Sequence, residues 1–427
     1  MLRISRIGAI AIGVFISSVS ALQAQSTYSP YSIYGVGDLN GMDLVHNIAM
    51  GEVGISTGSP FHINNKNPAL LTHNRVVVFE TALSTEQKKL STDNLSQNNF
   101  TGGLGYLVFA FPVVRDTWTM SFGLMPYSTV NYESRDLGFV PGTETGLGTT
   151  YDGSGGVTQA YFSSGLKVVK GLSVGLRAAY LFGSITQETQ YFVENTAYLT
   201  ADVSRNSFSD VTYGLGMAYS LELKKDQNYL NFGITYDFGG DQGVTRLERL
   251  ERRSLSGDPQ SPIDKPPYLV TNDLNGSVEF PSEVGFGIGF EKRLKWTIAG
   301  DFSTGKWSEY RGFDGELEGL NDRTEIAVGG SFIPDAFSVG SYLSRVTYMI
   351  GFNYQKTPYL VDEHEIDDFG INFGVTLPLR NISRLSLAFK LGERGTTEND
   401  LIHERYFRAY LGLTINDNKW FVRRKFD

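Results

Sequence analysis

The chain has 427 residues, a formal net charge of −9, 48 glycines and no cysteine. The lack of cysteine excludes disulfides, thiolate metal sites, a cysteine nucleophile and a lipoprotein anchor. The acidic balance argues against nucleic acid as a partner. A membrane-spanning helix needs about 20 continuous apolar residues. Only the N-terminus has a continuous apolar stretch, so helical spans are not expected in the rest of the chain.

The N-terminal stretch predicts a secretory signal peptide over residues 1–24. Two arginines precede the apolar run 7–16, and small residues lead to Ala21 and Ala24, after either of which cleavage fits the pattern. The mature chain would then be exported. Without disulfides, it would have to be held together by its own sheet.

Between residues 74 and 416, large apolar residues alternate with Gly, Ser, Thr, Asn or charged residues. The stretch 284–291, VGFGIGFE, shows this clearly. A period of two predicts β-strands with one apolar face. Fourteen such runs occur, at residues 74–84, 100–112, 117–132, 157–169, 172–190, 210–224, 228–238, 277–292, 294–304, 322–334, 346–356, 367–378, 383–393 and 404–416.

The length of these runs favours a membrane barrel over a soluble sandwich, whose strands also alternate. Sandwich strands most often have about five or six residues, whereas a tilted membrane strand needs about 9 to 11. We therefore predict an all-β fold, a transmembrane antiparallel barrel of 14 strands in the lipid bilayer of the outer membrane. In the run 210–224, Tyr213 and Leu215 would face lipid, while Gly214 and Gly216 would face the lumen.

The connections between the runs alternate between long and short, which indicates two different ends of the barrel. Short turns of such barrels face the periplasm and long loops face outward. An even strand count then places both termini, including a basic tail at 417–427, on the periplasmic side. In the longest connection, residues 246–253 (RLERLERR) suggest a short amphipathic helix. The long connections are predicted at 85–99, 133–156, 191–209, 239–276 and 305–321.

Residues 25–73 show no period and are rich in Gly, Ser, Asn and Pro. A stretch of about fifty unpatterned residues is unusual in a compact domain. A barrel of this size would otherwise enclose an open pore, so we predict that the segment is a plug in the lumen. A mobile periplasmic tail is the alternative. The many apolar residues between Ile48 and Leu71 argue against it.

Short motifs occur both in this segment and in the later strands. Ala49-Met50-Gly51 is followed by Gly54, and Asn67-Pro68-Ala69 is followed by Leu71. A second set comprises Pro281, Gly285, Gly287, Gly289, Trp296, Asp301 and Trp307-Ser308. These motifs resemble the hatch motif and a strand-turn-strand signature of the FadL-type outer-membrane transporters of long-chain fatty acids and other hydrophobic compounds. Family members commonly end on an aromatic strand, unlike the tail found here.

The resemblance implies passive transport of a hydrophobic small molecule past the plug. Under this hypothesis Asn67, Pro68 and Ala69 hold the fold of the plug. The apolar residues that would line the ligand path are Phe61, Ile63, Leu70 and Leu71.

Pro126 lies inside the third predicted strand, in Met125-Pro126-Tyr127. Proline cannot donate to a strand ladder and normally sits at edges or bulges. Members of the FadL-type family have a kink in the third strand that makes a lateral window into the membrane, and Pro126 falls where that kink would be. A simple bulge near a strand end is the alternative.

No enzyme chemistry, metal or cofactor is predicted. Five histidines are scattered without an HExxH pattern. Residues 54–58 (GISTG) match the G-x-S-x-G form of serine hydrolases, but they lack the strand-to-helix turn that the motif requires.

Two further functions remain open from the sequence. FadL-like barrels include PorV-type subunits that accompany a secretion translocon, so the long polar loops could bind a secretion-system protein. A general porin is the third hypothesis, and the predicted plug argues against it.

Overall fold

A computed structural model of the chain describes residues 28–254, 267, 269–379 and 382–418. The predicted signal peptide at 1–24, the first residues of the predicted plug and residues 419–427 of the basic tail lie outside the described residues. No helix among the described residues is long and apolar enough to cross a membrane.

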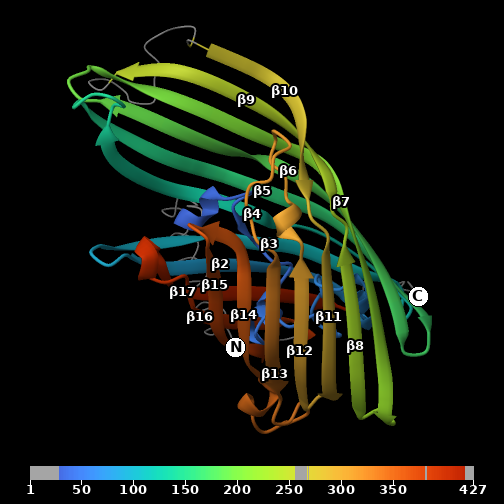
Figure 1. Cartoon of the computed structure of the whole chain (residues 1–427). Coiled ribbons are helices and arrows are strands. Elements are labelled where there is room, and N and C mark those ends of the chain that lie inside the picture. The colour runs from blue at the N-terminus through green and yellow to red at the C-terminus, as the bar shows by residue number, and fades with distance from the viewer. Residues whose placement is uncertain (1–27, 255–266, 268, 380–381, 419–427) are drawn as a thin grey trace, which may run out of the picture.

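Fourteen antiparallel strands form a closed ring, seven from β2 to β8 and seven from β11 to β17 (Figure 1). Strand β8 pairs directly with β11, and β17 pairs with β2 to close the ring. The predicted 14-stranded barrel is therefore confirmed. Its strands are β2 (Val77–Ser91), β3 (Ser96–Val114), β4 (Trp118–Phe139), β5 (Gly146–Val169), β6 (Leu172–Val193), β7 (Tyr198–Lys224), β8 (Asn228–Asp237), β11 (Glu283–Lys292), β12 (Trp296–Gly305), β13 (Arg323–Phe332), β14 (Thr347–Val361), β15 (His364–Pro378), β16 (Arg384–Arg394) and β17 (His403–Asp417).

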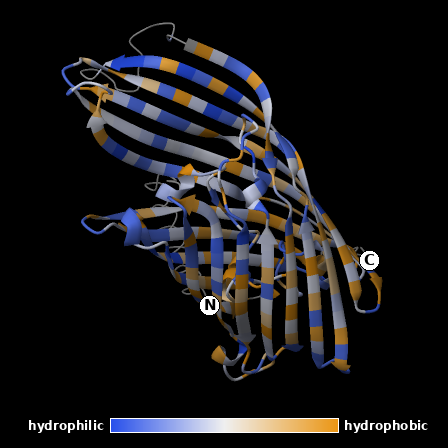
Figure 2. Cartoon of the chain, in the orientation of Figure 1, coloured by the Kyte–Doolittle hydropathy of each residue, from blue (hydrophilic) through white to orange (hydrophobic). Residues whose placement is uncertain are grey.

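The period of two in the sequence separates an apolar exterior from a glycine-rich interior. On β7, Tyr213 and Leu215 are 53% and 43% exposed, whereas Gly214 and Gly216 are buried. Hydrophobic and hydrophilic residues alternate along the other ring strands as well (Figure 2). An apolar outer face of this kind is what a barrel presents to lipid.

Several strands continue far beyond the ring and form a second, open sheet. The first part of β7, from Tyr198 to Phe208, pairs with β9 (Gly240–Ser254), while its second part pairs with β8. Strand β10 (Leu269–Phe280) pairs with β9. Strands β4, β5, β6, β7, β9 and β10 thus make a six-stranded sheet that leans over the barrel, here called the wing (Figure 1).

Four of the predicted long loops are wrong. Residues 85–99 (in β2 and β3), 133–156 and 191–209 are mostly strand, with tight turns at 92–95, 140–145 and 194–197, and the range 239–276 contains β9 and most of β10. These segments are polar, so they lack the apolar alternation by which the membrane strands were recognised. Their backbone groups nevertheless pair with a neighbouring strand, which satisfies their hydrogen bonds without an apolar face.

The predicted helix at 246–253 is also wrong, because these residues lie in β9. Their leucines fit a helical period, but the ladder to β7 pairs Leu250 with Asp202 and Leu247 with Arg205. The predicted strand 277–292 is in fact two strands, β10 and β11. It breaks at Pro281, which cannot donate to a ladder.

The two ends of the barrel differ as expected from the connections. One end has short turns, such as 115–117, 170–171, 225–227 and 293–295, and is called the short-turn end. The other carries the wing and is called the wing end. Among the described residues, the connections contain the single-turn 3-10 helices η3 (Trp307–Glu309), η4 (Leu343–Arg345) and η6 (Glu398–Asp400).

The described part of the N-terminal segment, residues 28–73, lies inside the ring. Its elements are η1 (Pro30–Ile33), β1 (Asp38–Leu39), α2 (Val45–Ala49) and η2 (Pro68–His73). Helix α2 contacts β14 to β17, whereas η2 contacts β4 to β7. Because these strands lie on different sides of the ring, the segment crosses the interior. Residues from Leu44 to Leu71 form a common apolar core with the inner wall.

Candidate lateral opening and lumen site

The Asn67-Pro68-Ala69 motif fixes η2 against the barrel wall. The buried Asn67 amide donates to the carbonyls of Ile55 (2.8 Å) and Met217 (3.0 Å), and its oxygen accepts from the Ala69 N–H (3.0 Å). Pro68 occupies the first turn of η2, where its missing N–H costs nothing. A single side chain thus links two parts of the N-terminal segment to β7.

The wall strands carry glycine where the backbone of the N-terminal segment touches them. A Cβ added at Gly175 would overlap Pro68, and one added at Gly329 would overlap the Met50 carbonyl. At these two positions glycine is required by the close approach of the N-terminal segment.

Two of the motif regions contact each other directly. Asp301 of β12 accepts hydrogen bonds from the N–H groups of Gly54 (2.6 Å) and Ile55 (2.8 Å). A buried carboxylate is stabilised by such backbone donors. This contact connects the early Gly54 motif with the late Asp301 signature.

The ladder between β3 and β4 stops in the middle of the barrel. Pairing runs from Val114 and Trp118 only as far as Leu107 and Leu124, two residues before Pro126. Beyond that point β3 pairs only with β2, while β4 continues along β5 with a register shift at Pro126. Pro126 therefore lies at the point where the two strands separate.

The N-terminal segment occupies the edge of β4 that β3 leaves. Strand β1 pairs with β4 through Asp38 and Leu39, opposite Thr129 and Ser128. The N–H of Asn40 donates to the Tyr127 carbonyl (2.8 Å), and that of Ser29 donates to the Asn131 carbonyl (2.9 Å). The backbone of β4 is thus paired on both sides, whereas no ladder partner of β3 at 96–106 other than β2 is found among the described residues.

A cavity of about 480 Å³ lies behind the separated strands. Its wall includes Thr101–Tyr106 of β3, Pro126 of β4 and residues 38–41 of the N-terminal segment. The opposite wall is charged, because Lys390, Arg394 and Arg408 line it together with carboxylates. The cavity therefore lies between the part of β3 that does not pair with β4 and a polar interior.

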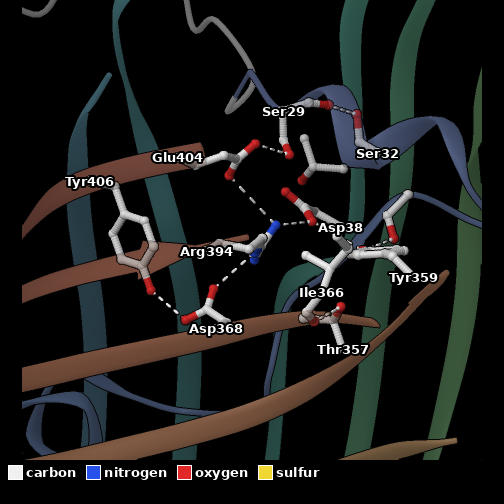
Figure 3. Close-up of polar contacts among 12 residues, drawn as sticks. Ser29, Ser32, Asp38, Thr357, Tyr359, Ile366, Asp368, Arg394, Glu404 and Tyr406 are labelled. Atoms are coloured by element: carbon white, nitrogen blue, oxygen red, sulfur yellow. Dashed lines mark hydrogen bonds and ion pairs between the residues drawn. The ribbon is translucent and has the colours of Figure 1, made fainter. Parts of the chain in front are cut away.

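The charges opposite this opening are paired in one network (Figure 3). Arg394 contacts Asp38 (2.6 Å) and Asp368 (2.9 Å), and Lys88 contacts Glu404 (3.0 Å). The Ser29 hydroxyl donates to Glu404 (2.6 Å). Because Ser29 and Asp38 belong to the N-terminal segment, the network holds that segment to β15, β16 and β17. Breaking one partner of such a buried pair is costly.

The phenol of Tyr31 belongs to the same contact region, at the start of the N-terminal segment. Its hydroxyl donates to the Ile402 carbonyl (2.5 Å). Burial raises the pKa of Tyr31 to about 12, so the phenol remains a neutral donor.

The four predicted lining residues do not share one surface. Phe61 lines a separate cavity of about 170 Å³ at the short-turn end, beneath the Arg384 guanidinium. Ile63, Leu70 and Leu71 are packed in the interior and do not line either this cavity or that behind β3 and β4. The apolar character of these residues indicated burial, but it could not show whether a side chain packs in the interior or lines a cavity.

One cluster in the lumen was missed by sequence reasoning. His46 and His62 lie against Glu80 of β2, with all ligand atoms within 4.8 Å of one another. The three residues are distant in sequence and follow no motif spacing, so the chain offered no signal for them.

A family model described as BamG matches residues 4–427. The chain belongs to the BamG family. Comparison with curated protein sequences gave no match.

Solved structures with this fold cover almost the whole chain. The CymD monoaromatic hydrocarbon channel has a TM-score of 0.55 and 13% identity, over 90% of this chain and 99% of that one. The Pseudomonas putida toluene transporter TodX has a TM-score of 0.54 and 16% identity, over 90% and 99%. A Pseudomonas aeruginosa FadL homologue has a TM-score of 0.56 and 10% identity, over 88% and 98%.

At these identities the likeness concerns the fold. It confirms the FadL-type, outer-membrane barrel architecture that the sequence motifs predicted. The PorV-type resemblance is not shown by these comparisons and stays a prediction.

Replacing Asn67 tests the role of the Asn67-Pro68-Ala69 motif. Asn67→Ala leaves buried backbone groups without partners, so we expect the free energy of unfolding in detergent to fall by roughly 1 to 3 kcal/mol. Denaturant titration followed by heat-modifiable migration measures this. The control is Asn94→Ala, in an exposed turn, which should change stability by less than about 0.5 kcal/mol. Equal effects of the two substitutions would show that the amide contacts are not needed.

Proposed function

We propose that this protein is a passive outer-membrane transporter of hydrophobic small molecules such as long-chain fatty acids. The ligand exchanges between the lumen and the bilayer at a lateral opening between β3 and β4. The observation that carries the proposal is the end of the β3–β4 ladder at Leu107 and Leu124, with a cavity directly behind it. Unpaired backbone in hydrocarbon costs several kcal/mol per group. The free-energy cost of the unpaired backbone groups is explained if the gap between the strands serves transport.

The cavity lining favours an amphiphile over a bare hydrocarbon. Leu104 lies on the bilayer side of the opening, whereas Lys390, Arg394 and Arg408 lie on the far wall. An acyl chain gains about 25 cal/mol per Å² of buried apolar surface near the strands. A polar headgroup would meet the charged side chains of this wall, where four cations and six carboxylates line the cavity. The names of the CymD and TodX structures, a monoaromatic hydrocarbon channel and a toluene transporter, support transport of an apolar molecule in general.

In this proposal residues 25–73 act as the plug. The plug blocks the lumen, and a shift of its contacts with β4 and β16 opens the path. The short-turn end and the basic tail at 417–427 face the periplasm, whereas the described chain begins on the wing side, where the Tyr28 hydroxyl donates to the Glu133 carbonyl. No cofactor or energy source takes part.

Photolabelling with a diazirine analogue of palmitic acid in lipid nanodiscs tests the lateral opening. We expect labelled peptides from residues 101–106 of β3 and residues 38–41, and excess oleate should remove this label at lower concentration than toluene does. Lipid-facing β11 to β13 serve as the internal control, since labelling by surrounding lipid should not respond to the competitor. Labelling of β3 that is no stronger than this control, and equally insensitive to oleate, would disprove the opening.

Removal of residues 25–73 tests the plug by single-channel conductance in planar bilayers. We expect a steady ion current from the truncated barrel and almost none from the full chain. Heat-modifiable migration confirms that the barrel has folded. Because the segment contributes to the core, Arg394→Ala serves as a milder variant, and it should increase the frequency of brief openings. A folded, truncated barrel that stays closed to ions contradicts the plug.

A second candidate function, binding of a protein partner such as a secretion-system component, is favoured by one observation on the wing. Leu137 and Phe139 of β4 are 88% and 69% exposed, at the far end of the wing from the ring. Large apolar side chains exposed together often mark interaction sites.

Charged substitutions test this candidate. Leu137→Asp combined with Phe139→Asp should release a protein that co-purifies in mild detergent, while folding and fatty-acid photolabelling stay unchanged. If the purified wild-type and variant proteins contain the same components, the apolar residues of the wing do not hold a partner.

A further inference from the structure

The cluster of His46, His62 and Glu80 joins the N-terminal segment to the barrel wall. His62 Nδ1 lies 3.4 Å from Glu80 Oε2, and His46 Nδ1 lies 4.0 Å from Glu80 Oε1. The two imidazole rings stack with centroids 4.6 Å apart. Each histidine therefore turns its Nδ1 toward a different oxygen of one carboxylate.

The charge of Glu80 has no fixed cation beside it. Its side chain is fully buried, and its ion-pair partners among the described residues are only the two histidines. The buried carboxylates Glu404 and Glu325 pair with Lys88 and Lys66, respectively, whereas Asp301 is held by two backbone N–H groups. A buried charge is expected to be paired or to coordinate a metal.

One nitrogen of the cluster that could bind a metal has no hydrogen-bond partner. The Nδ1 of His46 is buried and makes no hydrogen bond, since 4.0 Å to Glu80 is too long. A tetrahedral metal bonded to both atoms at about 2.0 to 2.1 Å would bring them to about 3.3 Å from each other, a small movement from the 4.0 Å found here. The His46 nitrogen without a hydrogen-bond partner and the carboxylate without a fixed cation thus point to the same ligand, a cation.

We propose that His46, His62 and Glu80 bind a divalent transition metal ion of the zinc class. Two imidazoles and a carboxylate are a set that zinc accepts, with a water or the Thr414 hydroxyl, 3.3 Å from His62 Nδ1, as the fourth ligand. The Tyr106 hydroxyl donates to Glu80 (2.8 Å) and orients it. Because a metal lies in the plane of each ligating ring, the His46 ring turns out of the stack when the ion binds.

The bound ion holds the N-terminal segment to β2. His46 belongs to α2, and His62 lies in the stretch before η2, so one ion connects two parts of the segment to the wall. Both histidines also line the 170 Å³ cavity at the short-turn end, which gives the ion a route to the site. This function goes beyond ligand transport and does not depend on it.

Metal titration of the purified full chain, carrying no histidine tag, tests the site. Isothermal titration with Zn²⁺ should show one site per chain, and Zn²⁺ should raise the thermal unfolding temperature of the wild type. His46→Ala combined with His62→Ala should weaken binding at least about 100-fold and abolish this stabilisation. The matched control is His73→Ala, a histidine of the same segment that bonds the Leu70 carbonyl, and it should bind Zn²⁺ as the wild type does.

Wild-type binding no tighter than that of the double variant would overturn the proposal. X-ray absorption of the Zn²⁺-loaded wild type needs no variant and guards against misfolding of the double variant. Two imidazole nitrogens at about 2.0 Å support the site. A zinc shell of oxygens alone overturns it.

Discussion

The structure depends on one constraint, that every backbone N–H and C=O within a bilayer needs a partner. The pairing of β17 with β2 closes the ring, so the backbone groups have partners around most of it. Between β3 and β4 the ladder ends, and the N-terminal segment supplies the missing partners to β4 through β1 and Asn40. The segment is therefore part of the wall as well as a filling of the lumen. Movement of the segment and opening of the wall would be coupled, because the same hydrogen bonds serve both.

The same constraint explains why the interior is polar and glycine-rich. With lipid outside, the apolar faces of the strands point outward, and the inner face is left to small and charged residues. The backbone of the N-terminal segment approaches the wall at glycines such as Gly175 and Gly329, and ion pairs such as Asp38 with Arg394 fix its position. Buried ion pairs add little stability compared with apolar packing, but losing one partner is costly. Such pairs suit a segment that holds one position against the wall.

The sequence predicted the parts of this fold that repeat. Alternation along β11 and β15 identified membrane strands, because lipid on one side imposes a period of two. The wing was missed, since its strands meet water on their outer face and their polar residues carry no such period. Residues 246–253 were wrongly predicted to form a helix, because leucines three residues apart fit the helical period. Their partners in β7 lie 40 to 54 residues earlier in the chain, so the pairing could not be recognised from the local sequence. The motifs pointed to residues with structural contacts, because Asn67 and Asp301 make hydrogen bonds that hold the N-terminal segment to the wall.

A site whose residues meet only in the folded structure could not be predicted from the sequence. His46, His62 and Glu80 follow no spacing rule, and only the path of the N-terminal segment across the ring brings them together. Their position has a physical consequence for the proposed transport. The hydrogen bonds of β1 to β4 hold the segment where β3 and β4 separate, and a metal at Glu80 would hold it on β2, two strands away around the ring. A segment held at both points leaves residues 96–106 of β3 with β2 as their one ladder partner among the described residues, so a ligand that entered there would displace neither attachment.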